Sequence, residues 1–134
     1  MKKRFLSLLL VLPLLPLLAS CGGGAAETKA AYTQITQEEA KGMMDRDENV
    51  IILDVREQNE YDTGHIPGAV LLPVGTIDAD SAAALIPAKD ATLLVYCRSG
   101  NRSKTAALAL AELGYSAVYE FGGIRTWRYE IVTD

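Results

Sequence analysis

The sequence predicts an α/β domain built on a mainly parallel sheet, and three observations lead to this fold class. Apolar, strand-like segments alternate with helix-like segments along the chain, as in repeated strand–helix units. One apolar run, Val50–Leu53, is continuous and mostly branched, as expected for a strand that is buried on both faces. Residues 32–134 suffice for one compact domain of about a hundred residues and not for two.

Five strands are expected, each bounded by turn residues or by the start of a helix. Their predicted ranges are Tyr32–Ile35, Val50–Leu53, Ala69–Leu72, Thr92–Tyr96 and Ala117–Glu120. The third strand should stop at Pro73, because proline lacks the N–H group that a strand ladder uses.

The predicted helices have clear start and stop signals. Thr36 and Glu39 form a capping-box pattern, which predicts a helix over Gln37–Asp45. Asp80 or Ser81 is the expected cap of a short helix that runs through Ile86. The other expected segments are a short helical turn within Glu57–Gly64, a strong helix over Ser103–Leu113 with Gly114 as its C′ residue, and a last helical stretch from Gly122 to near Tyr129.

Residues 1–20 have the composition of a secretory signal peptide. Lys2–Arg4 supplies the positive start, and the apolar run Phe5–Ala19 is too short to span a bilayer comfortably. Leu18 to Cys21 matches the bacterial lipobox, in which the cysteine becomes the lipidated first residue of the mature chain. We therefore expect a lipidated Cys21 and a flexible tether over residues 21–31, followed by a domain over residues 32–134. The alternative is a plain signal peptide that ends near a cysteine.

These signals predict an exported protein that is held on the periplasmic side of the envelope by its lipid alone. Gly22 follows the cysteine, and by the sorting rule for enterobacterial lipoproteins this favours the outer membrane. Loss of the signal removes three positive charges from a chain whose net charge is already −4. Because nucleic-acid binding needs a basic face, we expect no nucleic-acid partner, and we expect a monomer.

Cysteine usage singles out Cys97. With Cys21 acylated, Cys97 is the one free thiol and has no partner for an intramolecular disulfide. A lone thiol that is kept in an oxidising compartment is more often used than merely tolerated. Cys97 and His65 do not supply the usual ligand set for zinc, so no metal site is expected.

Cys97 also heads the segment Cys97–Arg102, which lies between a predicted strand and a predicted helix. Backbone N–H groups in such a loop can form an anion cradle, and the helix N-terminus adds positive potential. Gly100 permits the backbone angles of a tight loop, while Arg98 and Arg102 add positive charge. These features favour a thiolate and a lowered pKa at Cys97. The structural alternative is an inert, buried cysteine that ends a strand.

Several motifs together resemble the rhodanese (thiosulfate sulfurtransferase) family. They follow the family's order and spacing over about Thr33 to Tyr129, and they are Leu53–Glu57, Glu60-Tyr61, Gly64–Ala69, Val95–Ser103 and Gly122–Ile124 with Trp127. The resemblance implies a rhodanese-like domain whose five-stranded sheet has helices on both faces. It also implies that Cys97 takes sulfur from thiosulfate or a related donor and passes it, as a persulfide, to cyanide or a thiol. No cofactor is expected.

Loop length separates this activity from its nearest alternative. Sulfurtransferase members of the family have a six-residue loop counted from the cysteine, as Cys97–Arg102 has, whereas related dual-specificity phosphatases have seven. The phosphatase pattern would place an arginine at the position of Ser103. A phosphatase or arsenate-reductase-like enzyme that uses Cys97 is therefore disfavoured. A non-catalytic rhodanese-fold binding module is the third alternative, and the intact Cys97 argues against it.

The expected substrate-binding residues follow the nucleophile directly. They are Arg98, Ser99, Gly100, Asn101, Arg102 and Ser103. Arg56 is a further candidate for substrate binding, with a structural ion pair to Glu60 as its alternative. Asp54 and His65 are expected to be structural residues near the site, since a thiolate activated by the loop needs no separate base. The predicted partners are a small anionic sulfur donor and a thiol or cyanide acceptor.

Overall fold

The computed structural model describes residues 29–134, and the predicted signal peptide, Cys21 and the residues up to 28 lie outside this range. Within it the strands are β1 (Thr33–Gln34), β2 (Ile51–Asp54), β3 (Val70–Leu71), β4 (Thr92–Cys97) and β5 (Ala117–Gly123). The helices are α1 (Gln37–Arg46), α2 (Gln58–Asp62), α3 (Ala79–Leu85) and α4 (Asn101–Glu112), with 3-10 turns η1 (Val74–Thr76) and η2 (Ile124–Thr126). None of the helices in residues 29–134 is both long enough and apolar enough to span a bilayer.

The five strands form one sheet in the order β1-β5-β4-β2-β3, and every pairing is parallel. The predicted parallel sheet is confirmed. Since all strands run in the same direction, their carboxyl ends lie along one edge, where Asp54, Cys97 and Gly123 end β2, β4 and β5. Ligands of such sheets bind beyond this edge.

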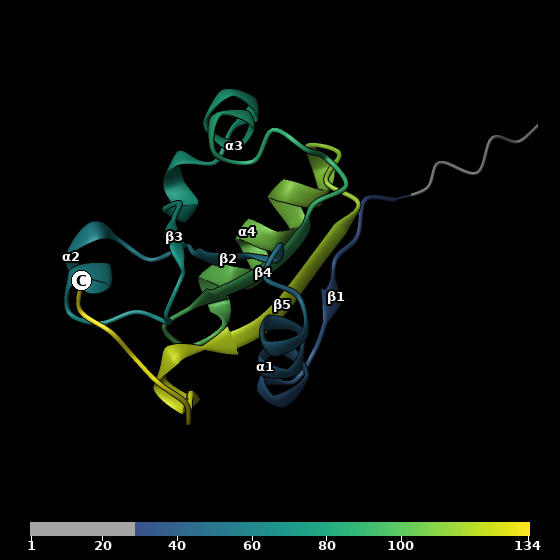
Figure 1. Cartoon of the computed structure of the whole chain (residues 1–134). Coiled ribbons are helices and arrows are strands. Elements are labelled where there is room, and N and C mark those ends of the chain that lie inside the picture. Colours follow the sequence, from purple (N-terminus) through teal and green to yellow (C-terminus); the bar gives the residue numbers. More distant parts are fainter. Residues whose placement is uncertain (1–28) are drawn as a thin grey trace, which may run out of the picture.

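Helices cover both faces of the sheet, as expected, and Figure 1 shows α1 and α4 on opposite sides of the strands. Successive side chains of β4 point to opposite faces, because the period of a strand is two residues. Leu93 and Val95 pack in the apolar cluster that includes side chains of α3 and α4. Leu94 and Tyr96 pack in the second cluster, with Ala40 of α1.

The clearest local predictions are confirmed. Thr36 Oγ1 accepts a hydrogen bond from Glu39 N (3.1 Å), and Glu39 Oε2 accepts one from Thr36 N (2.7 Å), so the capping box starts α1. Gly114 follows the last residue of α4 with a φ of +98°, the left-handed conformation expected at a C′ glycine.

Other boundaries differ from the predictions. Asp78, and not Asp80 or Ser81, caps α3, because its carboxylate accepts from Ser81 N at 2.8 Å. The last helical stretch is a single turn, η2, because β5 continues through Gly122 and Gly123 before it can begin. The helix after Cys97 starts at Asn101, two residues before the predicted start at Ser103. The predicted cysteine loop and the first turn of α4 therefore overlap.

β5 carries a bulge next to the carboxyl end of β4. Val95 pairs with Glu120, but Cys97 pairs with Gly123, so β5 has one more residue than β4 between these two pairs. Beyond the bulge, Gly123 lies directly on the backbone that follows β4. A Cβ atom at Gly123 would lie 2.1 Å from Arg98 O. Only glycine leaves room for this contact between two backbones.

We predict that Gly123→Ala destabilises the fold by about 1–3 kcal/mol, because the methyl group must displace the Arg98 backbone. Gly75→Ala is the matched control, since a Cβ there would meet no atom within 4 Å. Chemical denaturation followed by far-UV circular dichroism measures both free energies of unfolding. Equal stability of the two variants would refute this account of Gly123.

Candidate active site

Cys97 lies at the end of β4 with its sulfur inside the loop that leads into α4. The residue is only 1% exposed. Gly100 N donates a hydrogen bond to Cys97 Sγ at 3.0 Å, and Gly100 adopts a left-handed φ of +99° to do so. α4 begins at the next residue, so the positive end of the helix lies beside the sulfur.

The surroundings of Cys97 favour its ionised form. Burial raises the pKa of the thiol. Hydrogen bonding with the Ser103 side chain, and with the backbone N–H groups of Ser103, Gly100 and Ser99, outweighs burial and brings the pKa of Cys97 below its usual value. These N–H groups are the donors that the predicted anion cradle requires, and a thiolate is the reactive form of cysteine.

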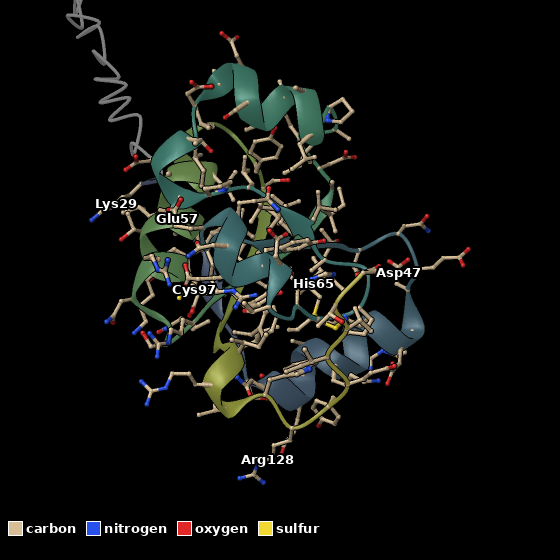
Figure 2. The ribbon with its side chains drawn as sticks, turned by 90° about the vertical axis from the view of Figure 1, so that its left-hand side faces the viewer. Lys29, Asp47, Glu57, His65, Cys97 and Arg128 are labelled. Carbon is tan, nitrogen blue, oxygen red and sulfur yellow. The ribbon has the colours of Figure 1, made fainter. Side chains whose placement is uncertain are left out.

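The loop residues named in the sequence divide into exposed and buried members. Arg98, Ser99 and Asn101 are exposed, whereas Gly100 and Ser103 are buried beneath them. Nitrogen-tipped side chains gather on the side of the molecule where Cys97 is labelled in Figure 2. The exposed members can meet a solute that approaches the sulfur, and the buried members hold the sulfur in place.

Arg102 is already paired. Its two terminal nitrogens donate to the two carboxylate oxygens of Glu60 on α2, at 2.7 and 2.8 Å. This bond lowers the pKa of Glu60 to about 2, and it raises the pKa of Arg102. The pair ties the first turn of α4 to α2 and neutralises much of the Arg102 charge, since bidentate pairs of this kind are strong.

The suggested ion pair between Arg56 and Glu60 is wrong, because Arg56 pairs with Asp54 instead. Arg56 Nε donates to Asp54 Oδ1 at 2.9 Å, and Arg56 Nη2 donates to Gly64 O at 2.7 Å. Arg56 is 4% exposed and Asp54 is fully buried. Two residues of separation let the arginine fold back on the end of β2. Substrate binding by Arg56 stays a prediction, but its known contacts are all structural.

Tyr96 fixes Asp54 from the neighbouring strand. Its hydroxyl donates to Asp54 Oδ2 at 2.6 Å and accepts from Ile66 N at 3.1 Å. Burial raises the pKa of Tyr96 well above its usual value, so the hydroxyl keeps its proton. Because Tyr96 directly precedes Cys97, this buried network supports the end of β4.

His65 makes its contacts away from the sulfur. Its Nδ1 donates to Tyr61 O at 3.0 Å, and its Nε2 lies 2.6 Å from Asp134 Oδ1. Its ring stacks on Tyr61 with centroids 3.7 Å apart. These contacts join α2, the following loop and the segment near Val132, and they are structural.

One residue of the site was missed in the sequence. Glu120, on β5, is 2% exposed, and its Oε1 atom accepts from Ser103 Oγ at 2.6 Å and from Gly122 N at 2.8 Å. The available signal was an acidic residue between the apolar neighbours Tyr119 and Phe121 within a strand. A carboxylate in such a position needs hydrogen-bond donors, and the bulge of β5 supplies one of them.

Two cavities border the loop from outside. One, of about 330 Å³, has Ser99, Gly100, Lys104 and Glu120 among its lining residues. The other, of about 260 Å³, is lined by Arg98, Ser99, Gly123, Arg125 and Thr126. A third cavity of about 360 Å³ lies between α1 and Trp127 and includes no residue of the loop. Residues 29–134 contain no cluster of three His, Cys, Asp or Glu side chains that could hold a metal ion.

This arrangement suits covalent chemistry on sulfur. The thiolate is a nucleophile, and the surrounding N–H groups can stabilise negative charge on an atom attached to it. Two arginines, Arg98 and Arg125, line a cavity beside the loop. The same arrangement is compatible with any small anion that presents an electrophilic atom to Cys97.

Comparison with known proteins identifies the family. Residues 36–130 match the model of the rhodanese-like domain. The chain is 36% identical over 99 residues to the thiosulfate sulfurtransferase GlpE of Pseudomonas fluorescens. The matched region covers 72% of this chain and 85% of GlpE. It is also 34% identical over 110 residues to the probable adenylyltransferase/sulfurtransferase MoeZ of Mycobacterium tuberculosis. That matched region covers 81% of this chain and only 28% of MoeZ. This chain therefore spans little more than a quarter of that relative.

A solved structure gives the same result. The fold is similar to that of a rhodanese with anions from E. coli, with a TM-score of 0.56, 30% sequence identity, and coverage of 63% of this chain and 98% of that one. The matched sequence range contains Cys97, the whole loop and Glu120. The resemblance drawn from the motifs is thus confirmed, and the chain belongs to the rhodanese-like domain family.

Proposed function

We propose that this protein is a sulfurtransferase that moves sulfane sulfur from thiosulfate, or a related anionic donor, to cyanide or a thiol acceptor. The observation that carries the proposal is the Cys97 sulfur, which accepts a hydrogen bond from Gly100 N at the start of α4 and has a lowered pKa. Relatives named as sulfurtransferases, among them the P. fluorescens thiosulfate sulfurtransferase, support it.

The proposed reaction has two displacements. In the first, the Cys97 thiolate attacks the outer sulfur of thiosulfate, a sulfur–sulfur bond to Cys97 forms, and sulfite leaves with the electron pair of the broken bond. The new persulfide anion remains beside the N–H groups of the loop. In the second, a thiolate or cyanide attacks the outer persulfide sulfur, and the electron pair returns to Cys97 as thiolate. No oxidant or reductant is consumed.

The rim of the loop favours an anionic donor. Arg98 and Arg125 line the same cavity, although the chain as a whole carries a net charge of −4. Local positive charge in an otherwise acidic protein directs small anions to that place. Arg102 contributes less to this attraction than the sequence alone indicates, since Glu60 holds both of its terminal nitrogens.

The contacts of Ser103 argue against a phosphatase. In the phosphatase pattern this position carries an arginine, which would bind the phosphate oxygens. Here the position holds a buried serine that contacts the Glu120 carboxylate at 2.6 Å. Ser103 therefore offers no positive charge to the phosphate oxygens, and its hydroxyl group is already used in a contact with Glu120.

The main prediction concerns the intact mass of the protein before and after it takes up sulfur. After incubation with thiosulfate, the intact protein should gain about 32 Da, one sulfur atom, and should lose it again on addition of cyanide or dithiothreitol. Intact-mass spectrometry measures both changes, and Cys97→Ala is the control that should gain nothing. Absence of the added mass in the wild type, or its persistence in Cys97→Ala, would contradict the proposal. Hydrolysis of a phenyl phosphate without sulfur loading would favour the phosphatase.

A second prediction concerns the arginine rim. The variant with both Arg98→Gln and Arg125→Gln should lose about threefold to tenfold in kcat/KM for thiosulfate at low ionic strength, because anion attraction is weakened. The loss should shrink in high salt. Arg46→Gln removes one positive charge at the end of α1 and should leave the rate unchanged. An equal loss in the Arg46 variant would mean that net charge, and not the rim, governs the rate.

We also propose that the protein works outside the cytoplasm, anchored to the envelope through a lipid on Cys21. The lipobox at Leu18 to Cys21 and the basic start of the chain support this location. A bacterial culture that expresses the protein and is fed radiolabelled palmitate should label the wild type and not Cys21→Ser. Labelling of both proteins, or of neither, would contradict the anchor.

A further inference from the structure

Glu120 is a buried carboxyl group that the proposed reaction does not use. It lies on β5, is 2% exposed, and forms no ion pair among the residues that the structure describes. Burial of an unpaired carboxylate is costly unless hydrogen bonds compensate for lost water. Its three donors are Ser103 Oγ, Gly122 N and Gln34 Nε2, the last at 3.1 Å from Oε2.

Ser103 connects this carboxylate to the reacting thiol. Ser103 Oγ lies 2.6 Å from Glu120 Oε1 and 3.4 Å from Cys97 Sγ. A serine hydroxyl has one proton to donate and two lone pairs that accept. The shorter contact goes to the carboxylate, so Ser103 donates its proton to Glu120 and accepts the S–H proton of Cys97.

The hydroxyl group of Ser103 cannot act as a donor to both partners. A Cys97 thiolate needs a donor, and Ser103 can donate to it only when residue 120 no longer accepts the hydroxyl proton. An amide in place of the Glu120 carboxylate meets this condition, because its N–H group can donate to Ser103 Oγ. The Cys97 thiolate and the Glu120 carboxylate therefore compete for the single proton of one hydroxyl group.

No charged side chain among the described residues pairs with Glu120 and so decides the competition for the Ser103 proton. From β4 the facing titratable group is Cys97, and from α4 it is Lys104, which lines the same cavity without an ion pair to Glu120. The polar side chains from β1 and α1 are the neutral amides of Gln34 and Gln37.

We propose that Glu120 is a positioning residue that controls the thiolate of Cys97 through the hydroxyl group of Ser103. The carboxylate accepts the hydroxyl proton and so withholds one donor from the Cys97 thiolate, which the N–H groups of the loop stabilise alone. The inference rests on the proposed function only in taking Cys97 as the reacting thiol.

The test is the rate of Cys97 alkylation by iodoacetamide, an uncharged probe, in the full-length chain between about pH 4 and pH 9. Mass spectrometry of the peptide that contains Cys97 gives the rate. Glu120→Gln should react about fivefold faster than the wild type at pH 7, because the competing negative charge is gone. The pH at which its rate reaches half of the maximum should also lie lower than in the wild type, because the thiolate gains a hydrogen-bond donor. A variant that is as slow as the wild type or slower, with an unchanged pH profile, would overturn the proposal.

Ser103→Ala tests the connecting hydroxyl group, and it remains informative if Glu120→Gln does not fold. Its alkylation rate at pH 7 should not fall below that of the wild type, because in the wild type the hydroxyl proton goes to Glu120 and not to the sulfur. A slower rate would mean that Ser103 donates to the thiolate despite Glu120, and it would overturn the proposal. In the Ser103→Ala background, the acceleration by Glu120→Gln should shrink to less than half. The same fivefold acceleration in both backgrounds would mean that Glu120 acts on Cys97 through space and not through Ser103. Alkylation involves no sulfur transfer, so these outcomes are independent of whether thiosulfate is the donor.

Discussion

The backbone of β5 touches the backbone that follows β4 at Gly123, so closely that a Cβ atom there would lie 2.1 Å from Arg98 O. The position of the active loop depends on this contact. It holds the turn in which Gly100 adopts its left-handed conformation and donates to Cys97 Sγ. The bulge just before Gly123 also turns Gly122 N toward Glu120, so one local irregularity of β5 shapes both the loop and the carboxylate beneath it.

The charges around the loop are arranged in layers. Arg98 and Arg125 are exposed and line a cavity beside the loop, backbone N–H groups donate to the sulfur, and the Glu120 carboxylate lies behind Ser103. The outer layer suits attraction of an anionic donor, and the middle layer suits a thiolate and the persulfide that would replace it. The innermost layer opposes negative charge at the sulfur. A site that both favours and restrains its thiolate is suited to a cysteine that must react with a donor but resist incidental oxidation.

Much of the fold and the central cysteine could be predicted because their signals are local in the sequence. The apolar run of β2, the capping box of Thr36 and the glycine after α4 each depend on a few consecutive residues. The partners of charged residues were harder, because they depend on contacts between distant segments. Arg102 meets Glu60 across 42 positions, and Ser103 meets Glu120 across 17. The bulge that aligns Glu120 with the loop leaves no pattern in the sequence.

The most direct measurement of the central claim is the release of sulfite in a single turnover. When thiosulfate is mixed with the protein and no acceptor is present, one sulfite should be released per chain, after which release should stop because Cys97 holds the sulfur. Cyanide should restart it, and Cys97→Ser should release none. Sulfite release that continues without an acceptor, or that persists in Cys97→Ser, would contradict a persulfide on Cys97.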